Sequence, residues 1–150
     1  MNWSKEYPME PIRVLFVCQH NSARSQIAET YLRHLGKDRF KVESSGLEPT
    51  EINPLVIEIM KEEGFDLSNN TTTDVFDLFR EGRLFQYVIA VCSPEVEKKC
   101  PMFPGVTDRL NWPFPDPAKV TGTHEEQLAA IRSIRDDIKT KIFRFVNELS

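Results

Sequence analysis

The residues best suited to chemistry in this chain lie near its N-terminus, in the segment CQHNSAR from Cys18 to Arg24. A cysteine thiolate is a strong nucleophile, and an arginine guanidinium is a fixed cation that can hold two oxygens of one anion. The combination favours attack by Cys18 on a tetrahedral oxyanion such as phosphate or arsenate.

A buried strand and an amphipathic helix are predicted to flank this segment. Residues 12–17 (IRVLFV) form an apolar run rich in β-branched residues, typical of a strand covered on both faces. From Ser25, apolar residues recur with helical spacing until Gly36, which is a helix stop signal. A loop that enters a helix directs several backbone N–H groups at one point, where the helix dipole adds positive charge. We therefore expect an oxyanion site formed by Gln19, His20, Asn21, Ser22, Ala23 and Arg24.

Individual residues of this loop have separate expected roles. The converging donors favour a thiolate at Cys18. The loop contains no glycine, so one residue must adopt a strained or left-handed conformation, and Asn21 is the best candidate, with an amide that can brace the loop. Ser25 can cap the helix or donate to the Cys18 sulfur. His20 is expected to make local hydrogen bonds and is not assigned a catalytic role.

A structural reading of the same residues is the alternative. In a bare C-x5-R match, the cysteine is usually a buried strand-end residue and the arginine a solvated helix residue. The predicted strand before Cys18 and helix after Arg24 favour the functional reading, because predicted context is what supports a motif.

The rest of the chain alternates between strands and helices. Asn53 followed by Pro54 indicates a helix start, and the apolar spacing after His124 predicts one long amphipathic helix that closes the open face of the sheet. The further elements expected are a strand at 40–45, a helix at 53–64, a short helix at 74–80, a buried strand at 87–91, a weaker strand at 106–110 and the long helix at 124–149. This alternation indicates an α/β fold, with a parallel sheet between helices joined by right-handed connections.

Composition limits the class of protein. The chain has 150 residues, 40% of them hydrophobic, which suits one domain, expected over residues 11–150 after a polar extension at 1–10. A formal net charge of -4 shows no basic excess for binding nucleic acid. We see no signal peptide or membrane span and expect a cytoplasmic, monomeric protein. The three cysteines then need catalytic or redox explanations, because the cytosol keeps thiols reduced.

The run VLFVCQHNSARSQIAE resembles the low-molecular-weight protein tyrosine phosphatase superfamily, and most closely its thioredoxin-coupled arsenate reductase branch. Asp116-Pro117, in WPFPDPAK, matches the acidic loop of that family, so the resemblance covers nearly the whole chain. It implies a three-layer fold with a four-stranded parallel sheet. It also implies that Cys18 is the nucleophile, Asn21 the loop organiser, Arg24 the oxyanion clamp, Ser25 the thiolate partner and Asp116 the general acid. From spacing alone, Asp116 is equally well explained as a turn residue.

The two other cysteines match the second and third thiols of the relay in that branch. Cys92 ends the buried strand YVIAV, and Cys100 follows in a segment polar enough to be exposed and mobile, so both are expected within reach of the loop. The resemblance implies that Cys18 attacks arsenate, Cys92 then attacks Cys18 and releases arsenite, and Cys100 finally attacks Cys92. No bound cofactor is expected, because thioredoxin, or a thiol such as glutathione or mycothiol, can reduce the last disulfide.

Other functions remain open. A phosphatase acting on phosphotyrosine needs Cys18, Arg24 and Asp116 but neither of the later cysteines. A redox sensor without catalytic activity needs only an oxidisable Cys18. A zinc site is improbable because Cys92 and Cys100 lack a second ligand pair, so no metal is expected.

Overall fold

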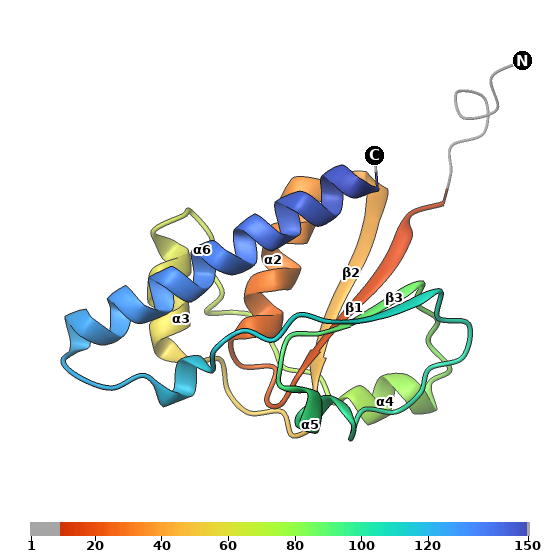
Figure 1. The fold of residues 1–150 in the computed structure, drawn as a ribbon, viewed down its shortest axis with the longest axis horizontal. Coiled ribbons are helices and arrows are strands. Elements are labelled where there is room, and N and C mark those ends of the chain that lie inside the picture. The colour runs from red at the N-terminus through yellow and green to blue at the C-terminus, as the bar shows by residue number, and fades with distance from the viewer. Residues whose placement is uncertain (1–9, 150) are drawn as a thin grey trace, which may run out of the picture.

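Four parallel strands form a single sheet in the computed structural model, which describes residues 10–149 (Figure 1). The order is β2-β1-β3-β4, and the bounds are β1 Ile12–Cys18, β2 Phe40–Gly46, β3 Tyr87–Ala90 and β4 Asp108–Asn111. The α/β prediction of a four-stranded parallel sheet is confirmed. All but Glu10 of the predicted polar extension lies outside the described residues.

Helices lie on both faces of this sheet and complete three layers (Figure 1). The α-helices are α2 Arg24–Gly36, α3 Pro54–Lys61, α4 Val75–Arg80, α5 Pro94–Glu97 and α6 His124–Glu148, with single 3-10 turns at η1 Lys37–Arg39 and η2 Pro117–Lys119. Among residues 10–149, none of these helices combines the length and the apolar character that a bilayer crossing requires.

The core is divided by the sheet into two clusters. Val14 and Phe16 of β1 face the first cluster, under α2, α3 and α6. Leu15 and Val17 face the second, which includes residues of α4 and of the following loops. Successive strand residues point to opposite faces, which explains why β1 is apolar throughout. The prediction that the long helix closes the open face of the sheet is wrong. Helix α6 packs beside α2 on the same face, and α4 and loops cover the opposite face.

The helix α2 ends at Gly36 as predicted, but the glycine does not supply a left-handed cap. Gly36 has an ordinary helical φ of -90°, and Lys37 adopts the positive φ of 49°. A Cβ at Gly36 would lie 2.3 Å from Cδ2 of Phe40. The glycine is needed here for close packing, because Phe40 returns against the helix end as β2 begins.

Two element boundaries differ from the prediction, and one helix was not predicted. Asn53 caps α3 as predicted, with Oδ1 accepting from the Leu55 N–H at 2.9 Å, but α3 ends at Lys61 and Gly64 lies in the following turn with a φ of 85°. The last strand covers Asp108–Asn111 rather than 106–110, because its ladder pairs only with Tyr87–Ala90. The short helix α5 was not predicted.

Candidate active site

The loop from Cys18 to Arg24 is held by its carbonyl groups. Four of them accept hydrogen bonds of 2.8–3.2 Å from backbone N–H groups of segment 47–53. The acceptors belong to Cys18, Gln19, His20 and Ser22. A trans peptide points its N–H away from its C=O, so the N–H groups that follow these carbonyls face the opposite, inner side of the loop. The loop is therefore shaped to receive an anion.

Cys18 lies at the end of β1 with its sulfur inside this loop. Its Sγ is 2.9 Å from Ser25 Oγ and 3.1 Å from the Asn21 backbone nitrogen, whose N–H donates to it. Ala23 occupies the N-cap of α2 without a side-chain cap. Of the two roles predicted for Ser25, the structure shows the contact with sulfur. Hydrogen-bond donors at this position stabilise negative charge on the thiol.

Asn21 has the predicted left-handed conformation, with a φ of 53°. Its Nδ2 donates to Ser25 Oγ at 2.8 Å and to Ser44 Oγ at 3.0 Å. Its Oδ1 accepts from the Thr73 N–H at 2.9 Å. The side chain therefore ties the loop to the end of β2 and to the segment before α4.

Gly46 supports the loop from β2, a role that the sequence reasoning missed. A Cβ there would lie 2.7 Å from the Asn21 nitrogen and 2.8 Å from the carbonyl carbon of His20. Both atoms are backbone and cannot move aside cheaply. The available signal was a glycine at the end of a predicted strand, where close backbone approach is a common reason for glycine.

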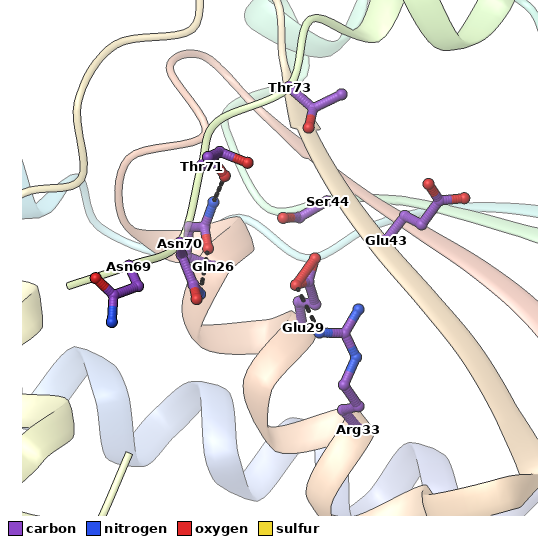
Figure 2. Close-up of a pocket in the computed structure, with 9 residues that line it drawn as sticks. All are labelled: Gln26, Glu29, Arg33, Glu43, Ser44, Asn69, Asn70, Thr71 and Thr73. Carbon is purple, nitrogen blue, oxygen red and sulfur yellow. Dashed lines mark hydrogen bonds and ion pairs between the residues drawn. The ribbon is translucent and has the colours of Figure 1, made fainter. Parts of the chain in front are cut away.

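A polar cavity of about 350 Å³ adjoins the partners of Asn21 (Figure 2). Glu29 lies in it beside Arg33, with 3.4 Å between Oε2 and Nη1. Burial raises the pKa of the Glu29 carboxyl, while the Arg33 charge and hydrogen bonds from Ser44 lower it. Ser44 thus links Glu29 to Asn21, and this cavity was not predicted.

Arg24 lies at the other end of the loop and is only 8% exposed. Its Nη1 donates to the Phe114 carbonyl at 2.9 Å, which joins the loop to the WPFPD segment. Both residues line a cavity of about 610 Å³ together with Cys92 and Asp116. The other lining residues are Gln19, Ser93, Val96, Pro113, Pro115 and Lys119. Residues far apart in the sequence therefore share one cavity.

Asp116 caps a turn and also lines the cavity. Its Oδ1 accepts from the Ala118 N–H at 2.9 Å and caps the 3-10 turn that follows, as a turn residue would. Its side chain also lines the cavity that contains Arg24, as an acid acting on a bound oxyanion would require. Trp112, by contrast, packs against Phe16 and Phe145 in the first cluster.

Cys92 is 1% exposed and belongs to the same buried cluster as Cys18. Burial and the neighbouring Cys18 sulfur raise the pKa of the Cys92 thiol to about 11, and the Arg24 charge acts in the opposite direction. The thiol is consequently protonated at neutral pH.

Cys100 is not exposed, and that expectation is wrong. It is 7% exposed, in the second cluster, and its Sγ lies 3.6 Å from the Pro101 carbonyl oxygen. Phe103, three residues further along the chain, is buried in that cluster too. The first cluster holds Cys18 and Cys92, so the sheet separates Cys100 from them.

The remaining predicted residues make local contacts. His20 Nδ1 lies 2.9 Å from the Glu48 carbonyl oxygen, which agrees with the structural role expected for it. Gln19 Nε2 donates to Glu48 Oε1 at 3.0 Å, so Glu48 is a further loop support that was missed. All three cysteines are free thiols. Within residues 10–149, no three His, Cys, Asp or Glu side chains gather where a metal ion could be held.

Comparison with known proteins places this site in context. The model of the family described as low molecular weight phosphotyrosine protein phosphatase matches residues 13–150. An arsenate reductase of Bacillus subtilis (strain 168) is 37% identical over 138 residues, which cover 91% of this chain and 96% of the relative.

Solved structures show the same similarity. A structure described as an arsenate reductase in oxidized state superposes with a TM-score of 0.77 at 28% identity, covering 95% of this chain and 100% of the other. A thioredoxin-dependent arsenate reductase of Corynebacterium glutamicum superposes with a TM-score of 0.62 at 30% identity, covering 93% of this chain and 65% of the other.

Proposed function

Because this chain belongs to the low molecular weight phosphotyrosine protein phosphatase family, we propose that its loop binds arsenate and that the protein reduces arsenate to arsenite. One observation carries the choice of reduction over hydrolysis. The Cys92 thiol lines the cavity that contains Arg24 and shares a buried cluster with Cys18. Hydrolysis of a phosphate ester needs no second thiol at that position, whereas reduction through an intramolecular disulfide does.

In the first step, the Cys18 thiolate attacks arsenic. A sulfur–arsenic bond forms while an arsenic–oxygen bond breaks, and the departing oxygen leaves as water once it is protonated. Asp116 is the general acid of this proposal, since its side chain lines the cavity. Arg24 and the inward N–H groups of the loop stabilise the charge on the remaining oxygens.

In the second step, the Cys92 thiolate attacks the Cys18 sulfur. The new disulfide joins Cys18 to Cys92, and the electron pair of the sulfur–arsenic bond stays on arsenic. Arsenic(V) thereby becomes arsenic(III) as two thiols are oxidised. The raised pKa of Cys92 means that this step accelerates as pH rises through the neutral range.

In the third step, Cys100 attacks Cys92 and frees Cys18 for another turnover. The resulting Cys92–Cys100 disulfide is then reduced from outside, and thioredoxin is our proposed reductant, with no cofactor bound to the protein. Support comes from the Corynebacterium relative, which is described as thioredoxin-dependent. Cys100 must first leave the second cluster.

A phosphatase reaction is the second candidate, because Phe114 and two prolines form an apolar wall in the cavity. An aryl phosphate could stack there while Cys18 forms a phosphoenzyme. This reaction would use Arg24 and Asp116 and would be indifferent to Cys92.

Arsenate-dependent NADPH consumption with thioredoxin and thioredoxin reductase tests the proposal. We expect turnover by the wild type and a loss of at least ~1000-fold in Cys92→Ser, as found when a nucleophile is removed. Cys100→Ser should still release one equivalent of arsenite per chain, because Cys100 acts after that release. Hydrolysis of p-nitrophenyl phosphate, measured in parallel, is the control. Brisk hydrolysis that survives Cys92→Ser, without arsenate turnover, would make the protein a phosphatase.

A further inference from the structure

The segment that joins Cys92 to Cys100 is tied to β4 by a network centred on Glu97. Arg109 Nε donates to Glu97 Oε2 at 3.1 Å, and Asn111 Nδ2 donates to Glu97 Oε1 at 2.6 Å. Both carboxylate oxygens of Glu97 are therefore engaged by β4. We call these three residues, Glu97, Arg109 and Asn111, the latch.

The latch also holds the backbone on both sides of α5. Asn111 Nδ2 donates to the Cys92 carbonyl at 3.3 Å. Arg109 donates to the carbonyls of Glu97 and Pro101, each at 3.3 Å. Each end of the segment that contains the two cysteines is thus fixed to the same strand.

Partial burial makes these contacts stronger than an ordinary surface pair. The side chains of Arg109 and Glu97 are 23% and 21% exposed. Charge-assisted hydrogen bonds that are shielded from water contribute more than exposed pairs, which are often worth little. The helix α5 has only four residues, too few to be stable alone, so the latch is a main support of the segment.

The closed latch is incompatible with the last step of the relay. Thiol–disulfide exchange needs the attacking sulfur in contact with the sulfur that it attacks. Cys100 is buried in the second cluster, on the opposite side of the sheet from the cluster of Cys18 and Cys92. Val96 of α5 packs against both clusters, so we expect α5 to shift when Cys100 moves toward Cys92.

We propose that Glu97 and Arg109 are positioning residues for Cys100, which keep its thiol in reserve until the latch opens and lets it reach Cys92. The proposal rests on the proposed function for its chemical step. In that step the Cys100 thiolate forms a bond to the Cys92 sulfur, the Cys18–Cys92 bond breaks, and Cys18 leaves as a thiolate. One disulfide replaces another, so no further oxidant is needed.

The charges around Cys100 agree with this role. Burial is the largest influence and raises the pKa of the Cys100 thiol; Glu97 raises it as well, and Arg109 lowers it. Opening the latch removes the burial, which is the largest influence, and also takes the thiol away from Arg109, which acts in the opposite direction. The same movement that releases Cys100 therefore favours its reactive thiolate.

Thiol labelling tests the latch without arsenate. In a Cys18→Ser, Cys92→Ser background, Cys100 is the single thiol of the chain, and its rate of reaction with a chromogenic disulfide reports opening. Glu97→Gln should raise this rate about tenfold, because one charge of a partly buried pair is lost. Glu95→Gln is the matched control, since Glu95 is exposed on the same helix, and should label at the parental rate. Asn111→Ala removes two latch contacts without changing charge and should act in the same direction.

Single-turnover chemistry provides the second readout, in otherwise wild-type protein. Glu97→Gln should speed formation of the Cys92–Cys100 disulfide by a larger factor than arsenite release, which it affects only through the lesser contribution of Glu97 to the pKa of Cys92. General loss of stability would not produce this division. If the Glu97, Asn111 and Glu95 variants all label Cys100 at the same rate while the wild type still reduces arsenate, the latch proposal is wrong and the proposed function stands. If the latch variants label faster but the wild type does not reduce arsenate, the proposed function is wrong and the latch proposal stands.

Discussion

At the residue level, the two thiols of the first cluster, Cys18 and Cys92, have different surroundings. Cys18 has a hydroxyl 2.9 Å and a backbone N–H donor 3.1 Å from its sulfur. Cys92 has no comparable donor among the described residues, and its nearest recorded partner is the Val17 carbonyl oxygen at 4.0 Å. A carbonyl oxygen cannot stabilise a thiolate. The arrangement favours Cys18 as the first nucleophile and keeps Cys92 protonated until the adduct has formed.

Alkylation of Cys92 should therefore depend steeply on pH. In Cys18→Ser, Cys100→Ser protein the contribution of Cys18 is lost, but burial, the main cause of the raised pKa of the Cys92 thiol, remains. A thiol well below its pKa gains tenfold in thiolate per pH unit, so the iodoacetamide rate should rise about tenfold per unit between about pH 8 and pH 10. A plateau below about pH 9 would show that the thiol is not held in its neutral form.

At the level of elements, the oxyanion loop depends on the strand beside it. The loop after β1 lies against the end of β2 so closely that Gly46 touches its backbone. The segment after β2 supplies the N–H groups that hold the loop carbonyls. The shape of the loop is therefore set by β1, β2 and the segment after β2 together, and a change in β2 should alter chemistry at Cys18.

Gly46→Ala should test that dependence. The added methyl group must push the loop backbone by several tenths of an ångström or more, and displacements of this order can cost about 100-fold in rate. We expect a fall of that order in kcat/KM for arsenate reduction. Gly64→Ala is the control: it strains a positive φ of 85° far from any neighbour, so it should lower the melting temperature and leave kcat/KM unchanged. Equal activity of the two variants would contradict the role given to Gly46.

At the level of the whole molecule, one sheet separates two buried clusters with different contents. Cys18 and Cys92 belong to the cluster under α2, α3 and α6, and Cys100 belongs to the other. The cavity joins the loop after β1 to the segment that follows β4, so an anion bound there bridges parts of the chain distant in sequence. A ligand that binds only this assembled state must stabilise the entire fold.

Phosphate, as an analogue of arsenate, should raise the melting temperature of the wild type. At a concentration of 100 times Kd the stabilisation is about 2.7 kcal/mol, which corresponds to roughly 5–10 °C for a chain of this size. Arg24→Met should lose the shift, because Arg24 provides the fixed cation of the site. Differential scanning fluorimetry with sulfate and chloride series, at matched ionic strength, separates binding from salt effects. An equal shift in Arg24→Met would place the anion elsewhere.

Local pattern was enough to predict most of the framework. The apolar run of β1, the capped start of α3 and the stripe of α6 depend on neighbours within a few residues, and the structure has all three. Asn21 could be identified because the loop contains no glycine and asparagine tolerates the left-handed conformation. The bounds of α3 and β4 differ from the predicted ones, because a turn ends α3 and pairing with β3 sets the length of β4.

The position of Cys18 and Arg24 between a strand and a helix could be inferred from the sequence, because chain connectivity brings both onto one short loop. Three features became evident only in the folded chain: the support of this loop by Gly46, the hydrogen bond from Arg24 to the Phe114 carbonyl, and the burial of Cys100 away from Cys92. These features depend on contacts between segments far apart in the chain. The polar residues around Cys100 suggest an exposed segment when the sequence is considered alone. In the folded chain, distant residues such as Arg109 form hydrogen bonds with these polar groups, and the segment is partly buried.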